Sequence, residues 1–190
     1  LNTLKSYTDR NFSEQAIRTQ IGYQEDSPVL THTRYRTKGS RNKIDLLEEA
    51  HPHSVGGLNI PSDDGHSRTI GAEKIMVHNG TVSIDLSSHD IDTQPVTSCD
   101  TEQLLILDSN EGHEYVIRNV PSSYAVITMG NGNEYAEGYV DRYGRRPLWV
   151  GVDKNGDHIL ASEDHAINVI GGNPIRAIKP GELVKVYRDG

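Results

Sequence analysis

Hydrophobic and polar positions alternate most regularly in the second half of the chain. From residue 115 onward, short runs rich in β-branched and aromatic residues are separated by tight turn signals, which is typical of strands. Asn131-Gly132 and Asn155-Gly156 predict hairpin turns between such runs. The pattern predicts strands at residues 123–129, 135–141, 148–152, 158–162 and 183–187, and a helix at 163–170 that ends at a glycine pair.

The first half is less regular. Residues 1–28 carry apolar positions at a loose spacing of three to four, which predicts a helix broken near residues 9–11. A strand is expected at 29–35. The polar, glycine-containing stretch 38–73 reads mostly as loop around one short helix near 44–50. Further on, the pattern predicts a strand at 74–78 that ends at Asn79-Gly80, with a possible continuation through 81–86, and a helix at 101–108 after Asp100.

Strands in two sets with helices at the margins predict a layered α+β fold. The length of 190 residues suits a single domain covering 1–190. Only 34% of the residues are hydrophobic, against roughly 45–50% in ordinary globular domains. We therefore expect a thin core, or a fold completed by another chain.

Charge and cysteine content exclude several classes of protein. The formal net charge is −8, and no basic run accompanies the aromatic residues, which argues against a nucleic-acid partner. No apolar run approaches the roughly 20 residues that span a bilayer, so no membrane partner and a cytoplasmic location are expected. The single cysteine, Cys99, excludes an internal disulfide and multi-cysteine metal sites within these residues.

Five short segments in one order carry the strongest functional signal. They are THTRYRTKG (31–39), AHPH (50–53), VHNG (77–80), CDTE (99–102), and DRYGRRPL (141–148) continued by ASE (161–163) and PGE (180–182). Together they resemble the glutaminase domain of the class II glutamine amidotransferases. The early segments are similar to glucosamine-6-phosphate synthase, and the later ones to amidophosphoribosyltransferase and asparagine synthetase.

The resemblance implies an N-terminal nucleophile hydrolase fold, a four-layer αββα sandwich, with glutamine as substrate and no cofactor or metal. It implies that Arg34 pairs with the α-carboxylate of glutamine and Asp100 with its α-ammonium. Asn79 and Gly80 match the oxyanion hole, which stabilises the negative charge of the tetrahedral intermediate. The neighbouring His78 and Thr101 are assigned to substrate binding as well.

The nucleophile that this family requires does not occur at its expected place. In the family, a Cys at residue 1 attacks the amide while its own α-amine serves as base. Position 1 here is Leu1, and only 33 residues precede Arg34. We expect the domain to be incomplete at its N-terminus, without its first strand or strands, and inactive unless a Cys-bearing segment exists outside this sequence.

Four other features have a plain structural interpretation beside a chemical one. Cys99 is a candidate substitute nucleophile, but the neighbouring Asp100 would raise its thiol pKa, so a buried structural thiol is the preferred interpretation. His51 and His53 lack a spaced third ligand and are expected to be structural. The segment 153–157 imitates the start of a calcium loop, yet a hairpin turn explains it. The segment 141–148 is expected to shape the sheet.

Two functional hypotheses follow. The first is a glutaminase domain that hydrolyses glutamine and passes ammonia to a synthase or transferase domain or subunit, as part of a larger chain or assembly. The alternative is a catalytically inactive amidotransferase-like fold that binds glutamine or serves as a structural module. An N-terminal nucleophile hydrolase that acts on a different amide remains a third possibility.

Overall fold

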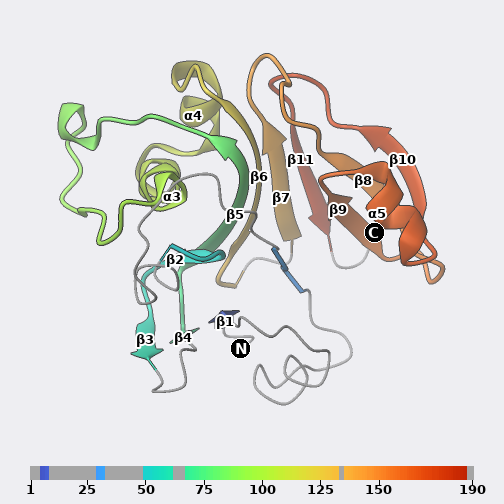
Figure 1. Cartoon of the computed structure of the whole chain (residues 1–190), viewed down its shortest axis with the longest axis horizontal. Coiled ribbons are helices and arrows are strands. Elements are labelled where there is room, and N and C mark those ends of the chain that lie inside the picture. Colours follow the sequence, from blue (N-terminus) through green and yellow to red (C-terminus); the bar gives the residue numbers. More distant parts are fainter. Residues whose placement is uncertain (1–4, 9–28, 33–48, 62–66, 133–134, 188–190) are drawn as a thin grey trace.

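A five-stranded antiparallel sheet forms the centre of the fold (Figure 1). The structure is a computed structural model that describes residues 5–8, 29–32, 49–61, 67–132 and 135–187. The strand order is β11-β7-β6-β5-β2. These strands are β2 (His53–Val55), β5 (Lys74–Thr81), β6 (Ser123–Gly130), β7 (Tyr135–Val140) and β11 (Leu183–Tyr187).

Two helices, α3 (Asp100–Glu111) and α4 (His113–Asn119), cover one face of this sheet (Figure 1). Because side chains alternate between the two faces of a strand, Tyr124 and Val126 of β6 point to the helices. They pack there with Leu104 of α3 and Val116 of α4 in the largest buried cluster.

A three-stranded antiparallel sheet with order β10-β8-β9 packs on the opposite face. Its strands are β8 (Trp149–Val152), β9 (His158–Ala161) and β10 (Asn173–Ala177), and α5 (Asp164–Val169) lies on its outer side (Figure 1). Ala125 of β6 and Val140 of β7 face this sheet and pack with Leu148 and Ile178. The described elements thus lie in the order helices, sheet, sheet, helix, and the predicted α+β class is confirmed.

The N-terminal half contains strands that the sequence did not indicate. β1 (Lys5–Thr8), β4 (Ser67–Ile70) and β3 (Leu58–Pro61) form a third antiparallel sheet in the order β1-β4-β3. The helix predicted at residues 5–8 is therefore wrong, and so is the loop predicted across β2, β3 and β4. Pairing between β1 and β4 joins residues about 60 positions apart, which local periodicity cannot reveal.

Several further elements differ from the prediction. β5 runs unbroken through Asn79-Gly80 to Thr81, where a turn was expected, because Gly80 stays in register with Tyr124 of β6. No strand follows β5 through residues 82–86; instead the chain reaches a short 3₁₀ helix, η1 (Leu86–Ser88). α4 and β10 were not predicted.

The expected strand at 29–35 and helix near 44–50 are only partly within the described residues. Residues 29–32 adopt no regular structure, and residues 49–50 lie at the start of a turn. Residues 33–35 and 44–48 lie outside the described part of the chain.

Most elements predicted for the C-terminal half are confirmed. The helix at 101–108, the strands at 123–129, 135–141, 148–152, 158–162 and 183–187, and the helix at 163–170 are all confirmed within a few residues. The Asn155-Gly156 hairpin joins β8 and β9 as predicted.

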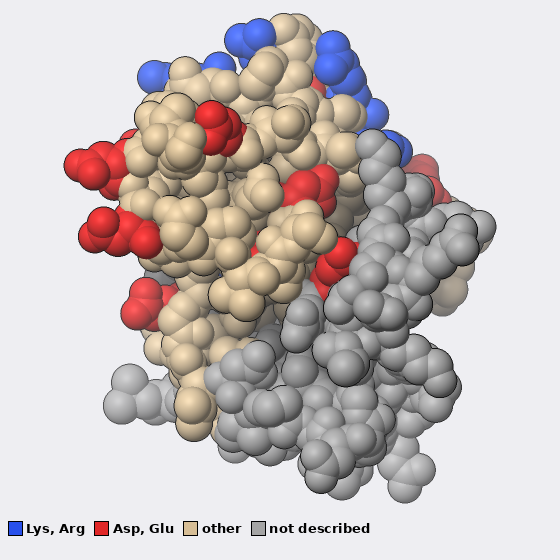
Figure 2. Space-filling model, turned by 60° about the vertical axis from the view of Figure 1, so that its left-hand side comes forward, with Lys and Arg blue, Asp and Glu red and all other residues tan. Residues whose placement is uncertain are grey.

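The charged surface is divided by sign on the face shown in Figure 2. Lys and Arg side chains lie along its upper margin, and Asp and Glu side chains lie mainly at its side and centre. Within the described residues, no helix has the length and apolar character needed to cross a bilayer.

Candidate functional site

The end of β5 and the start of α3 bring the predicted site residues together. β5 lies next to the short edge strand β2, and α3 packs beside β5 (Figure 1). The predicted residues Asp100 and Thr101 are in the first turn of α3. Arg34, the predicted carboxylate ligand, lies outside the described residues. The residues so assembled are His78, Asn79 and Gly80 from β5 and Asp100 and Thr101 from α3.

A hydroxyl group connects the two elements. Thr101 Oγ1 lies 3.0 Å from His78 Nδ1 and 2.7 Å from His51 Nε2, and Thr101 is completely buried. A threonine hydroxyl donates one hydrogen bond and accepts others, so it can serve both rings. Thr101 therefore fixes the imidazoles relative to each other and to the start of α3.

His78 is held neutral by its environment. Burial lowers its pKa from 6.5 to about 4, although the carboxylate of Asp100 acts in the opposite direction. Within the described residues, its buried Nε2 has no hydrogen-bond partner. The ring thus presents an uncharged edge next to Gly80, where an added Cβ would lie 2.9 Å from that nitrogen.

Asp100 is the first residue of α3 and is anchored to the end of β5. Its Oδ2 accepts a hydrogen bond of 3.0 Å from the N–H of Val82, which ties α3 to the chain just after β5. The side chain is partly exposed, and a carboxylate has more acceptor positions than this one bond uses. Its second oxygen, Oδ1, lies 4.0 Å from Cys99 Sγ.

Gly80 occupies a position that no other residue fits without a shift. Its φ is +146°, and an added Cβ would lie 2.1 Å from the carbonyl oxygen of Ser123. Among the described residues, β2 pairs with Lys74–Met76 alone, so β6 is the one described neighbour of β5 from Val77 onward. Alternate N–H groups of β5 consequently face an edge without a partner strand, as an oxyanion hole requires.

Cys99 and the segment 49–53 meet beside this site. Cys99 is buried, with Sγ 3.8 Å from the carbonyl oxygen of Glu49 and 4.0 Å from His51 Nε2. Ser98 donates a 2.8 Å hydrogen bond to the Glu49 side chain. The sequence offered His51 and His53 no third ligand, but the fold brings Cys99, 46 positions beyond His53, to both of them.

Two turns have the structural roles that were predicted for them. The buried carboxylate of Asp141 accepts hydrogen bonds from the N–H groups of Tyr124, Tyr143 and Arg145, which closes the turn after β7. In the β8–β9 hairpin, Asp153 Oδ1 accepts from the N–H groups of Asn155 and Asp157.

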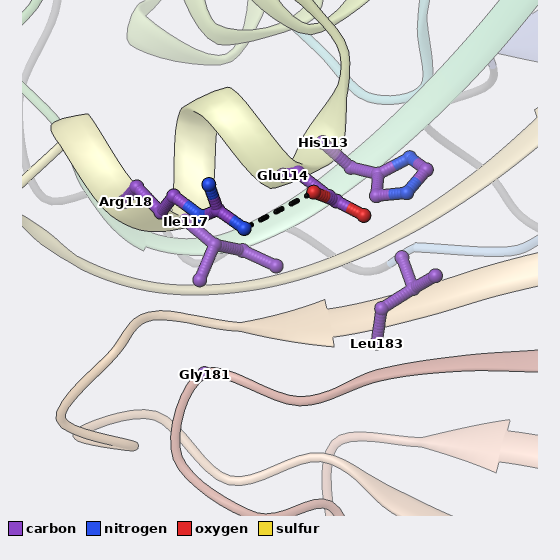
Figure 3. Close-up of a pocket in the computed structure, with 6 residues that line it drawn as sticks. All are labelled: His113, Glu114, Ile117, Arg118, Gly181 and Leu183. Atoms are coloured by element: carbon purple, nitrogen blue, oxygen red, sulfur yellow. Dashed lines mark hydrogen bonds and ion pairs between the residues drawn. The ribbon is translucent and has the colours of Figure 1, made fainter.

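A separate depression lies between α4 and the start of β11 (Figure 3). Its volume is about 230 Å³, below the range of roughly 300–1,000 Å³ for typical ligand pockets. Glu114 and Arg118 on its rim form an exposed ion pair of 3.3 Å. It contains none of the predicted site residues, and its lining consists of His113, Glu114, Ile117, Arg118, Gly181 and Leu183.

Comparison with known proteins gives consistent relatives, although no family model matches the chain. An amidophosphoribosyltransferase from Synechocystis is 25% identical over 192 residues, which cover 94% of this chain and 35% of the relative. The enzyme of the same name from Haemophilus influenzae is 31% identical over 185 residues, covering 85% and 33%. The chain thus spans about a third of the length of these relatives.

A solved structure agrees with the sequence relatives. The glutamine phosphoribosylpyrophosphate amidotransferase from B. subtilis superimposes with a TM-score of 0.51 and 24% identity. The match covers 72% of this chain and 30% of that chain. This likeness is one of fold.

Proposed function

From its confirmed resemblance to the class II glutamine amidotransferases of the N-terminal nucleophile hydrolase superfamily, we propose that this chain holds glutamine in a glutaminase domain. Residues 1–190 belong to one domain of the four-layer αββα type, and turnover requires an N-terminal Cys that is not among these residues. The domain releases ammonia from glutamine and passes it to a synthase or transferase domain or subunit. We place the protein in the cytoplasm.

The position of Asp100 carries this proposal. Its carboxylate is anchored by one oxygen to the N–H of Val82 and keeps acceptor capacity for a ligand ammonium group. In the proposed complex, Asp100 binds the α-ammonium of glutamine and Arg34 binds its α-carboxylate. A bidentate guanidinium and a carboxylate together distinguish an amino acid from a simple amide.

The reacting amide then lies toward the end of β5. Asn79 supplies a side-chain N–H and Gly80 a backbone N–H to the oxygen that becomes negatively charged during attack. Among the described residues, no strand pairs with this edge of β5 beyond Met76, which supports the role because an N–H group engaged in a strand ladder is not available to substrate. The attacking thiolate would come from an N-terminal Cys that is not among these residues.

His78 and Thr101 hold these parts at fixed separation. The 3.0 Å contact between His78 Nδ1 and Thr101 Oγ1 joins the strand with the oxyanion donors to the helix with Asp100. Since His78 stays neutral down to a pH of about 4, it adds no positive charge that would repel the ammonium group of glutamine. We assign both residues to positioning.

Binding of L-glutamine to the chain tests the proposal. Asp100→Asn removes the charge but keeps the shape, and we expect a 10- to 100-fold weaker dissociation constant, about 1.5–3 kcal/mol for a charged hydrogen bond. The measurement is isothermal titration calorimetry. Asp92→Asn, at an exposed position before α3, is the matched control and should bind as the parent chain does. Equal binding by the parent chain and Asp100→Asn would overturn the assignment.

The alternative function is an inactive glutamine-binding or structural module, supported by the low hydrophobic content of 34%, which suits a domain stabilised by partners. Intact mass and N-terminal sequencing of the native protein, together with glutamate release from L-glutamine, separate the two. A segment that begins with Cys and turnover of glutamine support the glutaminase. A native protein that binds glutamine without hydrolysing it is the module.

The acceptor of ammonia belongs to the part of the protein that this chain does not cover. The relatives are named for phosphoribosyl transfer, so we propose a phosphoribosyl acceptor as the first to test. The motifs of the first half are equally similar to a sugar-phosphate amidotransferase, which makes a hexose phosphate the second.

A further inference from the structure

Three metal-binding side chains converge at the start of α3. One ligand atom each from His51, His53 and Cys99 lies within 4.8 Å of the others, and Cys99 Sγ is 4.0 Å from His51 Nε2. The ring centroids of His51 and His53 are 5.4 Å apart in an edge-to-face arrangement. The two histidines come from one short segment, and the thiol comes from the residue that caps the start of α3.

The cluster sits in surroundings that favour a cation. His53 and Cys99 are buried, and Cys99 Sγ lies 4.0 Å from the carboxylate of Asp100 and 3.8 Å from the backbone carbonyl oxygen of Glu49. A thiol beside a carboxylate keeps its proton in the absence of metal, whereas a bound divalent cation stabilises the thiolate. Thr101 contacts His51 Nε2 at 2.7 Å and so fixes the orientation of that ring beside Cys99.

We infer that His51, His53 and Cys99 form a site for a divalent transition-metal ion of the zinc class. On binding, the Cys99 thiol releases its proton to solvent, and Sγ and one nitrogen of each imidazole each donate an electron pair to the ion. Zinc bonds of about 2.3 Å to sulfur and 2.0–2.1 Å to nitrogen require the ligand atoms, which lie within 4.8 Å of one another, to draw together to roughly 3.4–3.6 Å. Three protein ligands leave a fourth position for water.

The ligand types decide the metal class. One soft thiolate with two imidazoles suits Zn²⁺ or Co²⁺ and does not suit Mg²⁺ or Ca²⁺, which prefer oxygen. The site is distinct from the proposed glutamine contacts, because it uses the side of the α3 start that faces the segment 51–53. Its effect is to fasten that segment to α3, so metal binding and folding are linked.

Cobalt binding is the direct test, since Co²⁺ replaces Zn²⁺ and a cobalt–thiolate bond gives a near-ultraviolet charge-transfer band. Addition of Co²⁺ to the chelator-treated chain should produce this band at one equivalent, and added Zn²⁺ should abolish it by displacement. Cys99→Ser should lose the band and bind Zn²⁺ about 100-fold more weakly or worse. His53→Gln should weaken Zn²⁺ binding to a similar degree.

His165→Ala, at an exposed position on α5, is the matched control and should titrate as the parent chain does. Circular dichroism of the metal-free variants shows whether each is folded. The Co²⁺ titration of the parent chain tests the inference even if a variant does not fold. No band at stoichiometric Co²⁺ in the folded parent chain, or a band that persists in Cys99→Ser, overturns the inference. Because glutamine is absent from this experiment, its outcome is independent of the proposed glutaminase function.

Discussion

Among the described glycines, Gly80 has the closest approach of backbone atoms to the position of an added Cβ. A methyl group there would meet the Ser123 carbonyl oxygen at 2.1 Å, and φ is +146°. We expect Gly80→Ala to lower the free energy of unfolding by about 3 kcal/mol or more, because both the strain and the clash must be relieved. Urea denaturation measures this.

Gly132 provides the comparison for that substitution. It also has a positive φ, +76°, but an added Cβ would meet nothing within 4 Å. Gly132→Ala should therefore cost only about 1 kcal/mol, the strain alone. If both variants lose the same stability, the close approach of β5 to β6 at Gly80 is not what demands glycine.

The depressed pKa of His78 makes stability depend on pH in a definite direction. With a pKa of about 4 in the folded state and 6.5 in the unfolded chain, the unfolded state binds more protons between these values. Stability from this residue is complete above pH 6.5 and falls by up to about 3 kcal/mol as the pH drops toward 4.

His78→Gln tests this assignment, since the amide can keep a hydrogen bond to Thr101 but does not titrate. Relative to the variant, the parent should lose up to about 3 kcal/mol of unfolding free energy between pH 7 and pH 4. Parallel pH profiles would show that the pKa of His78 is the same in the folded and the unfolded chain.

At the scale of elements, the start of α3 is tied to the preceding turn by one carboxylate. Glu102 accepts hydrogen bonds from the N–H groups of Val96 (2.9 Å) and Thr97 (2.7 Å) and from the Thr97 hydroxyl. This resembles a capping box, in which a third-position Glu reaches back over the helix start. The interaction holds Cys99 and Asp100 in place.

Glu102→Ala should destabilise the chain by about 1–2 kcal/mol, the value of a lost helix cap. Amide hydrogen exchange at residues 96–100 should accelerate in parallel. Ser109→Ala, on an exposed position of the same helix, should change the unfolding free energy by less than about 0.5 kcal/mol. Unchanged exchange in Glu102→Ala would mean that other contacts hold the turn.

Elements whose signals are local in the sequence could be predicted from it. The hairpin of β8 and β9 and the helix α3 were predictable, because turn residues and apolar spacing lie within the element itself. β10 was missed since Pro174 argues against a strand, but β10 is an edge strand, where a missing N–H is tolerated. Asp100 and Gly80 were predicted as site residues from motifs alone, whereas the meeting of Cys99 with His53 depends on long-range packing.

At the scale of the whole molecule, a buried ion pair joins the central sheet to its covering helices. Lys74 of β5 and Asp108 of α3 are paired, and the Asp108 side chain is fully buried. A buried carboxylate without its partner is costly, so Lys74→Met should lower the unfolding free energy by about 3–5 kcal/mol.

The double variant Lys74→Met/Asp108→Leu separates pairing from desolvation. It removes both charges, and most of the stability lost in the single variant should return. Thermal or urea unfolding of the four proteins in this cycle gives the coupling energy. A double variant as unstable as the sum of the two single variants would show that the ions act independently.

The central claim is that glutamine binds between the end of β5 and the start of α3. Titration of the ¹⁵N-labelled chain with L-glutamine, followed by amide chemical shifts, tests it most directly. We predict the largest shifts at Asn79, Gly80, Asp100 and Thr101, and no saturable shift with succinamide, which lacks the α-amino acid group. Saturable shifts centred instead on His113 and Gly181, in the depression of Figure 3, would contradict the account.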